Sequence, residues 1–120
     1  MTEPGFASLA EIEKYIWSEL SIAPASLEHP WRFPVFGTRS RAGCELRTVV
    51  LRKFDALRGC LYCHTDVRSQ KVAQLRFDPR TQWLFYNPQT RIQLRVTASP
   101  EGFRMVNWQI SSGRKVILPA

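Results

Sequence analysis

The sequence predicts a mainly β (α+β) fold, in the form of a small β-barrel with an N-terminal helix and one short helix between its strands. The first observation is a series of five to seven short segments after residue 34, in which the residue pattern is that of strands separated by turns. The second is that only two segments have the apolar spacing of a helix. A length of 120 residues agrees with one such domain.

The first helix is expected close to the N-terminus. Ser8 and Glu11 have the spacing of a capping box, in which the two side chains satisfy free amide groups at the start of a helix. Apolar residues then recur every three or four positions and would form one buried stripe, until Pro24 ends the helix. The residues of this predicted stripe are Leu9, Ile12, Ile16 and Leu20.

Strands are expected through most of the remaining chain. The predicted strands cover residues 35–38, 44–53, 60–65, 82–86 and 92–98, and residues 103–110 and 116–118 could add a further pair. The second helix is predicted over residues 67–77, where apolar residues recur at helical spacing before Asp78 and Pro79 stop it.

Positive charge is concentrated in the middle of the chain. The whole sequence has a net charge of +7, whereas residues 32–95 alone carry +9 and residues 1–31 carry −4. Such a segment favours an anionic or phosphorylated partner. A nucleic acid is one alternative, but we do not expect it, because the aromatic residues mostly fall at strand-core spacing. These aromatic residues are Trp31, Phe54, Tyr62, Trp83 and Tyr86.

The three cysteines do not indicate a metal or haem site. Cys60, Cys63 and His64 match the C-x-x-C-H string of haem attachment, but two positions three apart in a strand point to opposite faces. Cys44 and His29 supply no second spaced pair of zinc ligands. The apolar runs are too short for a membrane helix, and the N-terminus lacks the features of a secretory signal. We therefore expect a cytoplasmic protein with reduced thiols and no membrane partner.

Two segments together have the character of a phosphate site. Arg47 and Arg52 lie near the two ends of a β-branched strand, and residues 65–71 open the second helix with hydroxyl groups and cations. The start of a helix offers unpaired amides and a partial positive charge to a phosphate, and an arginine on a neighbouring strand could complete the site. The alternative is that each cation is a solvated surface charge.

The order and spacing of these segments resemble the pyridoxamine 5′-phosphate oxidase-like, FMN-binding split β-barrel proteins. The residues that carry the resemblance are 47–52, 65–71, 78–79, 84–86 and 91–96. The resemblance implies a split β-barrel that binds FMN. It also implies a homodimer with FMN at the interface, where each site draws residues from both chains.

The resemblance also assigns roles to single positions. Arg47 and Lys71 match the residues that hold the FMN phosphate, and Arg52 stands near the pyrimidine edge of the flavin. Gln93 matches a glutamine that reaches the flavin, and the backbone of residues 49–51 matches the strand along its ring. The other expected cofactor-binding residues are Thr48, Val49, Val50, Leu51, His64, Thr65, Arg68, Ser69 and Gln70.

The expected activity is that of an FMN-dependent oxidoreductase, with hydride transfer from a substrate to flavin N5. No catalytic residue is assigned, because the flavin carries the chemistry. The alternatives are a non-catalytic flavin-binding or sensing protein and, after it, a basic nucleic-acid-binding β-barrel. The family's substrate-phosphate motifs have no match after residue 98, so the small-molecule substrate stays open. We expect one domain over residues 1–120, with a short or truncated C-terminal part after about residue 98.

Overall fold

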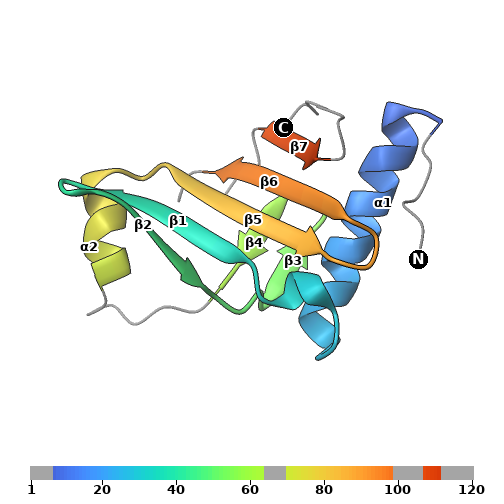
Figure 1. Ribbon diagram of the computed structural model, residues 1–120, viewed down its shortest axis with the longest axis horizontal. Helices are drawn as coiled ribbons and strands as arrows, with labels where there is room; N and C mark the ends of the chain where they lie inside the picture. Colours follow the sequence, from blue (N-terminus) through green and yellow to red (C-terminus); the bar gives the residue numbers. More distant parts are fainter. Residues whose placement is uncertain (1–6, 64–69, 99–106, 112–120) are drawn as a thin grey trace.

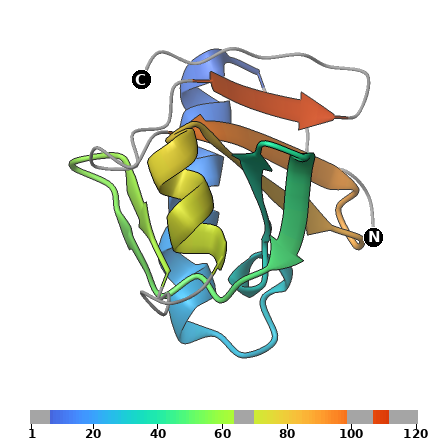
Figure 2. The same ribbon diagram turned by 90° about the vertical axis from the view of Figure 1, so that its left-hand side faces the viewer.

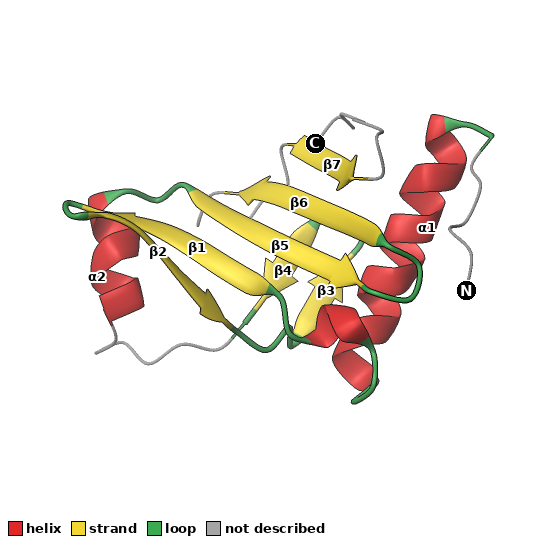
Figure 3. Cartoon of the chain, in the orientation of Figure 1, coloured by secondary structure: helices red, strands yellow, loops and turns green. Residues whose placement is uncertain are grey.

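The computed structural model describes residues 7–63, 70–98 and 107–111, and the statements below concern these residues. In chain order, the elements are helix α1 (Leu9–Ile22), the 3-10 helices η1 (Ala23–Ala25) and η2 (Pro30–Arg32), strands β1 (Val35–Ser40), β2 (Gly43–Thr48), β3 (Lys53–Asp55) and β4 (Cys60–Tyr62), helix α2 (Gln70–Phe77), and strands β5 (Thr81–Asn87), β6 (Ile92–Ala98) and β7 (Asn107–Ser111). The described part of the chain is therefore mainly strand, as Figure 3 shows by colour.

Two antiparallel sheets make up the β structure. The larger sheet has the strand order β2-β1-β5-β6-β7, and β3 pairs with β4 in a separate hairpin. Figure 1 shows α1 near one end of the larger sheet and α2 near the other end, beside the turn that joins β1 and β2. In Figure 2, the β3–β4 hairpin lies on the other side of α2 from β1 and β2. The described strands do not close into a cylinder, and the predicted fold class is confirmed in this open form.

Helix α1 begins as its sequence predicts. The Ser8 side chain accepts a hydrogen bond from the Glu11 amide at 3.2 Å, while the Glu11 carboxylate accepts from the Ala7 amide at 2.6 Å. The apolar stripe starts one turn later than expected, because Leu9 is 57% exposed at the outer end of the helix. The buried residues of α1 are Ile12, Ile16 and Leu20.

The core lies between the larger sheet, α1 and the hairpin. Phe36 on β1 meets Trp83 on β5 edge to face, with ring centroids 4.8 Å apart, and Trp83 stacks on Phe85 at 6.1 Å. On the other side of the core, Trp17 of α1 packs against Phe54 of β3 at 5.2 Å. Along β5 and β6, buried residues alternate with more exposed ones, so one face of each strand is turned toward the core.

The predicted strand over residues 44–53 is two strands with a connection between them. Strand β2 ends at Thr48 and β3 begins at Lys53. The amides of the connection bond to two different parts of the fold: Val49 donates to the Pro34 carbonyl at 3.0 Å, Leu51 to Arg32 at 2.8 Å, and Arg52 to Tyr62 at 2.8 Å. This segment therefore crosses from the neighbourhood of β1 to β4 and joins the two sheets.

Within the described part, the other predicted strands are present, some of them with changed bounds. Strand β1 continues to Ser40, and β5 extends the predicted strand by one residue at each end. Strand β6 has the predicted bounds. Residues 64–69, 103–106 and 116–118 lie outside the described part, so the beginning of the predicted second helix and most of the predicted last pair are not described. Strand β7 overlaps the first strand of that pair and ends one residue after its predicted end.

The cysteines and aromatic residues divide between core and surface. Cys60 is buried on β4, Cys63 is partly buried after β4, and Cys44 is exposed on β2. Because β4 ends at Tyr62, Cys63 lies after the strand and not within it, as the predicted strand over residues 60–65 would have it. Of the five aromatic residues considered above, Tyr62 and Tyr86 are surface-exposed and the other three are buried. Neither helix of the described part has the length and hydropathy needed to cross a membrane.

Candidate functional site

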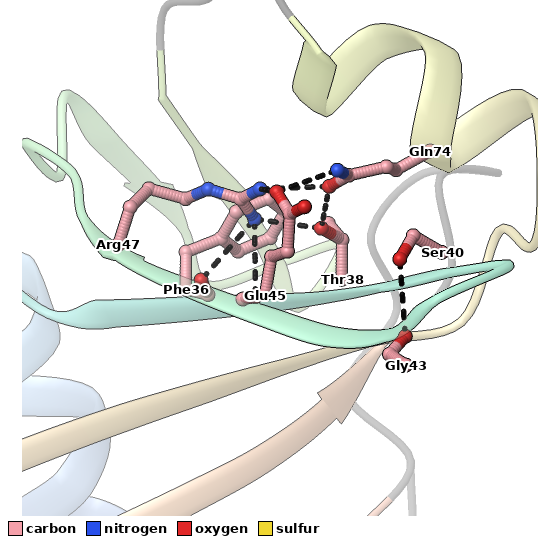
Figure 4. Close-up of polar contacts among 7 residues, drawn as sticks. All are labelled: Phe36, Thr38, Ser40, Gly43, Glu45, Arg47 and Gln74. Atoms are coloured by element: carbon pink, nitrogen blue, oxygen red, sulfur yellow. Dashed lines mark hydrogen bonds and ion pairs between the residues drawn. The ribbon is translucent and has the colours of Figure 1, made fainter.

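Arg47 is at the centre of a cluster of polar side chains at one end of the larger sheet. The members of this Arg47 cluster are Thr38 on β1, Glu45 and Arg47 on β2, and Gln74 on α2. Figure 4 shows the guanidinium group of Arg47 among the other three side chains, with α2 above the two strands. The cluster joins the edge strand to the second helix.

Every member of the cluster is held by at least one short contact. Arg47 donates from Nη1 to Thr38 Oγ1 at 2.7 Å and from Nη2 to Gln74 Oε1 at 2.8 Å. The Thr38 hydroxyl donates to the same oxygen of Gln74, and Gln74 Nε2 donates to Glu45 Oε2 at 2.6 Å. The bonds of Arg47 to described residues use Nη1 and Nη2, and none of them uses Nε.

The cluster is closed toward the core and open toward solvent. Thr38 and Gln74 are 2% and 7% exposed, whereas the side chains of Arg47 and Glu45 are 24% and 44% exposed. A guanidinium group that is fixed from behind by neutral side chains and still reaches solvent is well placed to bind an anion, because its bonds are charge-assisted and its position is set in advance.

The alternation of β2 explains how the strand contributes two members. Glu45 and Arg47 are two positions apart, so their side chains share one face of the strand. In the antiparallel register, Thr38 lies opposite Glu45 and Phe36 opposite Arg47. Gln74 follows Lys71 by three positions in α2, a spacing that places two residues on the same side of a helix. The predicted phosphate residues Arg47 and Lys71 thus belong to elements that are in contact.

The segment after β2 presents its residues alternately. Val49 and Leu51 are buried in the core, while Val50 is half-buried and Arg52 is exposed. A ligand beside this segment would therefore meet its backbone, Val50 and Arg52. Thr48, at the end of β2, is exposed and lies opposite Val35, on the other side of the sheet from Arg47.

Gln93 is not brought near Arg47. Its neighbours Ile92 and Leu94 are buried, so Gln93 on β6 faces away from the core. Arg47 lies opposite Phe36 in the register, so the two side chains are on the same face of the sheet. Phe36 is buried, so this is the face toward the core, opposite to that of Gln93. One chain alone therefore places these two predicted flavin residues on opposite faces of the larger sheet.

Four predicted cofactor-binding residues, His64, Thr65, Arg68 and Ser69, lie outside the described residues. Gln70 and Lys71 occupy the first turn of α2. Three members of the Arg47 cluster were missed by sequence reasoning: Thr38, Glu45 and Gln74. The sequence carried a signal for two of them. Glu45 is two positions from Arg47, the spacing of one face of a strand, and Gln74 is three positions from Lys71, the spacing of one side of a helix.

Two other arginines near α2 already have a carboxylate partner. Asp78, just after α2, accepts hydrogen bonds from the Arg80 side chain at 2.7 and 3.0 Å, and Arg39 on β1 lies 3.1 Å away. The hydrogen bonds from Arg80, helped by the charge of Arg39, hold the pKa of Asp78 well below its usual range. Arg47 differs from Arg39 and Arg80, because its short hydrogen bonds go to the neutral side chains of Thr38 and Gln74. The nearest carboxylate, Glu45, forms only a longer ion pair with it, at 3.5 Å.

The pKa of Tyr15 on α1 is also shifted. Burial raises the pKa of its phenol, and the neighbouring Glu19 carboxylate raises it further. The same Glu19 lies 3.5 Å from Nε2 of His29, whose Nδ1 accepts a hydrogen bond from the Trp31 amide. These contacts attach α1 to the chain before β1, at the other end of the sheet from the Arg47 cluster (Figure 1).

Comparison with known proteins identifies the family. Residues 21–101 match the model of the family described as pyridoxamine 5′-phosphate oxidase, FMN-binding domain. Because the match covers more than half of the chain, the protein belongs to this family, and FMN is the cofactor that defines it. The resemblance inferred from the sequence is thus confirmed. No curated protein sequence matches the chain.

Solved structures agree with this assignment. The chain is 31% identical to a pyridoxamine 5′-phosphate oxidase-related, FMN-binding protein from Nostoc punctiforme PCC 73102, with a TM-score of 0.62 over 77% of this chain and 48% of that one. The chain therefore spans about half the length of that relative.

Two more distant structures share the fold alone. General Stress Protein 26 from Bacillus anthracis str. Sterne is 15% identical, with a TM-score of 0.55 over 71% of this chain and 60% of that one. A conserved hypothetical protein from Mycobacterium tuberculosis is 20% identical, with a TM-score of 0.54 over 82% and 56%.

Proposed function

We propose that this protein binds FMN with its phosphate at Arg47 and the start of α2, and that it is an FMN-dependent oxidoreductase. The observation that carries the proposal is the position of the Arg47 guanidinium, which Thr38 and Gln74 fix beside α2 while it stays open to solvent. FMN needs a cation for its phosphate, and Lys71 in the first turn of α2 adds a second cationic residue to the same region.

The connection between β2 and β3 is suited to the flavin ring. Because Val49 and Leu51 are buried, the segment would present its backbone and the apolar side chain of Val50 to a ligand. Arg52 is exposed at the end of this segment. A cation there would stabilise negative charge at the pyrimidine edge of the ring.

The chemistry that FMN supplies when bound is hydride acceptance at its N5 atom, followed by reoxidation by oxygen or another acceptor. The protein's part is to hold the phosphate at Arg47, to place the ring along residues 49–51 and to present Arg52 at its edge. No side chain is required as a nucleophile for this task.

We also propose that the complete site needs two chains. Gln93 faces away from Arg47 across the larger sheet, so one chain cannot bring both to one flavin. In a homodimer, Gln93 of the partner could approach the Arg47 side of the first chain. The face that carries Gln93 also shows apolar area for such a contact, with Leu46 and Tyr86 73% and 47% exposed.

The direct test is FMN binding by the purified protein and by Arg47→Ala. We expect a yellow protein with the absorbance spectrum of bound FMN, and an affinity about 10- to 100-fold lower in the variant, since charge-assisted hydrogen bonds are lost. Arg58→Ala is the matched control, because it removes the same charge at an exposed position between β3 and β4. A colourless protein that takes up no added FMN contradicts the proposal.

Turnover is tested separately from binding. Amines and nicotinamide donors are added to the FMN-loaded protein without oxygen, and bleaching of the flavin absorbance identifies a donor. Bleaching by one class of donor supports an oxidoreductase. Tight binding of FMN that no donor reduces supports the alternative of a flavin-binding or sensing protein.

A further inference from the structure

A carboxylate lies inside the cluster that we propose as the phosphate site. Oε2 of Glu45 is 3.5 Å from Nη2 of Arg47 and accepts a 2.6 Å hydrogen bond from Gln74. Figure 4 shows the Glu45 side chain reaching from β2 toward the same guanidinium nitrogen that bonds to Gln74. An anion belonging to the protein therefore stands beside the cation that would bind the ligand's anion.

The contact between Glu45 and Arg47 is weak. Charge-assisted N–H···O bonds measure about 2.7 to 2.9 Å, so a separation of 3.5 Å is an ion pair without a good hydrogen bond. The neutral amide of Gln74 holds Glu45 more closely than the guanidinium does. The Glu45 side chain is 44% exposed, so it has room to turn toward solvent and be hydrated there.

A bound phosphate would change this balance. A phosphate monoester carries about −1.5 to −2 charges at neutral pH, and beside Arg47 it would lie within a few ångströms of the Glu45 carboxylate. Like charges at such distances repel, and the partial burial of the cluster limits screening by solvent. Binding of the phosphate must therefore either move the Glu45 carboxylate away or be weakened by the repulsion between the two anions.

We infer that Glu45 is an internal anion that competes with the FMN phosphate for Arg47 and so lowers the affinity of the protein for FMN. The inference rests on the proposed function. It makes Glu45 a residue that sets how strongly the protein prefers FMN to riboflavin, which has the same ring without the phosphate. The opposite role, in which Glu45 positions Gln74 for binding, predicts the opposite sign.

The test compares Glu45→Gln with the wild-type protein. Glutamine has the same shape and keeps an oxygen that can accept from Gln74, so the variant removes charge with little change of geometry. FMN and riboflavin are titrated separately, and the quenching of flavin fluorescence gives each Kd. Glu13→Gln is the control, because it removes one negative charge at an exposed position on α1, outside the Arg47 cluster.

We expect Glu45→Gln to bind FMN about tenfold more tightly, which corresponds to about 1.4 kcal/mol, while its Kd for riboflavin changes by less than about twofold. The control should change neither Kd by more than about twofold. Glu45→Ala should shift FMN binding in the same direction, which guards against an effect of glutamine itself.

Three results would overturn the inference. Unchanged or weaker FMN binding by Glu45→Gln shows that the carboxylate does not compete, and the proposed function stands if wild type still binds FMN. If Glu45→Gln binds riboflavin more tightly by the same factor as FMN, the effect does not act through the phosphate. A wild-type protein that binds no FMN rejects the proposed function, and the role of Glu45 falls with it.

Discussion

Nη2 of Arg47 on β2 lies 2.8 Å from the side-chain oxygen of Gln74 on α2, and the two residues are 27 positions apart in the sequence. Strand β2 is the edge strand of the larger sheet, and β1 is its only neighbour among the described strands. The guanidinium group reaches over β1, where it also bonds to Thr38, and meets Gln74 on the helix. A side chain of the edge strand is therefore bonded to a helix that comes later in the sequence. This tie fixes a cation at the site that we propose for the flavin phosphate.

Replacement of Thr38 by valine tests whether the Arg47 cluster also stabilises the fold. The Thr38 hydroxyl is buried, accepts from Arg47 and donates to Gln74. Valine keeps nearly the same volume but removes both bonds, and it leaves buried polar groups with fewer partners. We expect the free energy of unfolding to fall by about 1–3 kcal/mol, measured by urea denaturation without flavin.

Thr48→Val is the matched control for this experiment, because Thr48 is exposed at the end of the same pair of strands. It should change the free energy of unfolding by less than about 0.5 kcal/mol. Equal stability of Thr38→Val and wild type would mean that the cluster orders side chains without stabilising the protein.

The sequence predicted the elements whose local pattern is strong. Strand β6 has the predicted bounds, because its alternation of apolar and polar residues is complete from Ile92 to Ala98. The start of α1 was predicted from Ser8 and Glu11, whose side chains act on amides close in sequence. Interactions among residues within one or two turns are visible in a sequence.

The sequence did not predict features that depend on how distant segments meet. Residues 44–53 read as one strand, but their hydrogen-bond partners change from residues 32–34 to Tyr62, so the strand is interrupted. Thr38 joined the site only through the register of β1, and no local pattern marks it. Gln74 joined it through the packing of α2, and its helical spacing from Lys71 was the one local signal for it. Arg47 was found because its cationic neighbourhood, and the resemblance, pointed to it.

The interruption after β2 gives a second prediction. Leu51 is fully buried, whereas Val50, its neighbour, is half-buried on the other side of the segment. Leu51→Ala should lower the free energy of unfolding by about 2–5 kcal/mol, because it leaves a cavity in the core. Val50→Ala, the adjacent control, should cost less than about 1.5 kcal/mol by the same urea assay. A larger cost for Val50 than for Leu51 would contradict the orientation of this segment.

The third prediction concerns pH. The folded state lowers the pKa of Asp78 below its value of about 3.9 in an unfolded chain, mainly through hydrogen bonds from Arg80. The ionised carboxylate therefore stabilises the fold above about pH 4, and this contribution is lost as the pH falls further. The variant Asp78→Asn lacks this carboxylate. The difference in the free energy of unfolding between wild type and variant should therefore be largest near pH 7 and should shrink toward pH 2.

Urea denaturation at several pH values between 7 and 2 measures this difference. Glu28→Gln serves as the control, since Glu28 is an exposed carboxylate before η2. Its stability relative to wild type should vary little over the same range. A difference for Asp78→Asn that is as large at pH 2 as at pH 7 would show that the lowered pKa does not contribute to stability.

The fourth prediction tests whether one flavin site takes residues from two chains. Arg47 and Gln93 lie on opposite faces of the larger sheet, so a shared site would pair Arg47 of one chain with Gln93 of its partner. Arg47→Ala and Gln93→Ala should each leave most sites empty at an FMN concentration that saturates wild type. In a mixed dimer of the two variants, one site has both defects and the other has neither.

Equal amounts of the two variants are unfolded together, refolded, and assayed for bound FMN. Random pairing makes half of the dimers mixed, so about a quarter of all sites should recover wild-type affinity. Arg47→Ala refolded with Gln74→Ala is the control, because Arg47 and Gln74 belong to the same chain's cluster and no mixed dimer then has an intact site. If the Gln93 mixture recovers no more FMN than this control, Gln93 does not act across the interface, and the two-chain site is wrong.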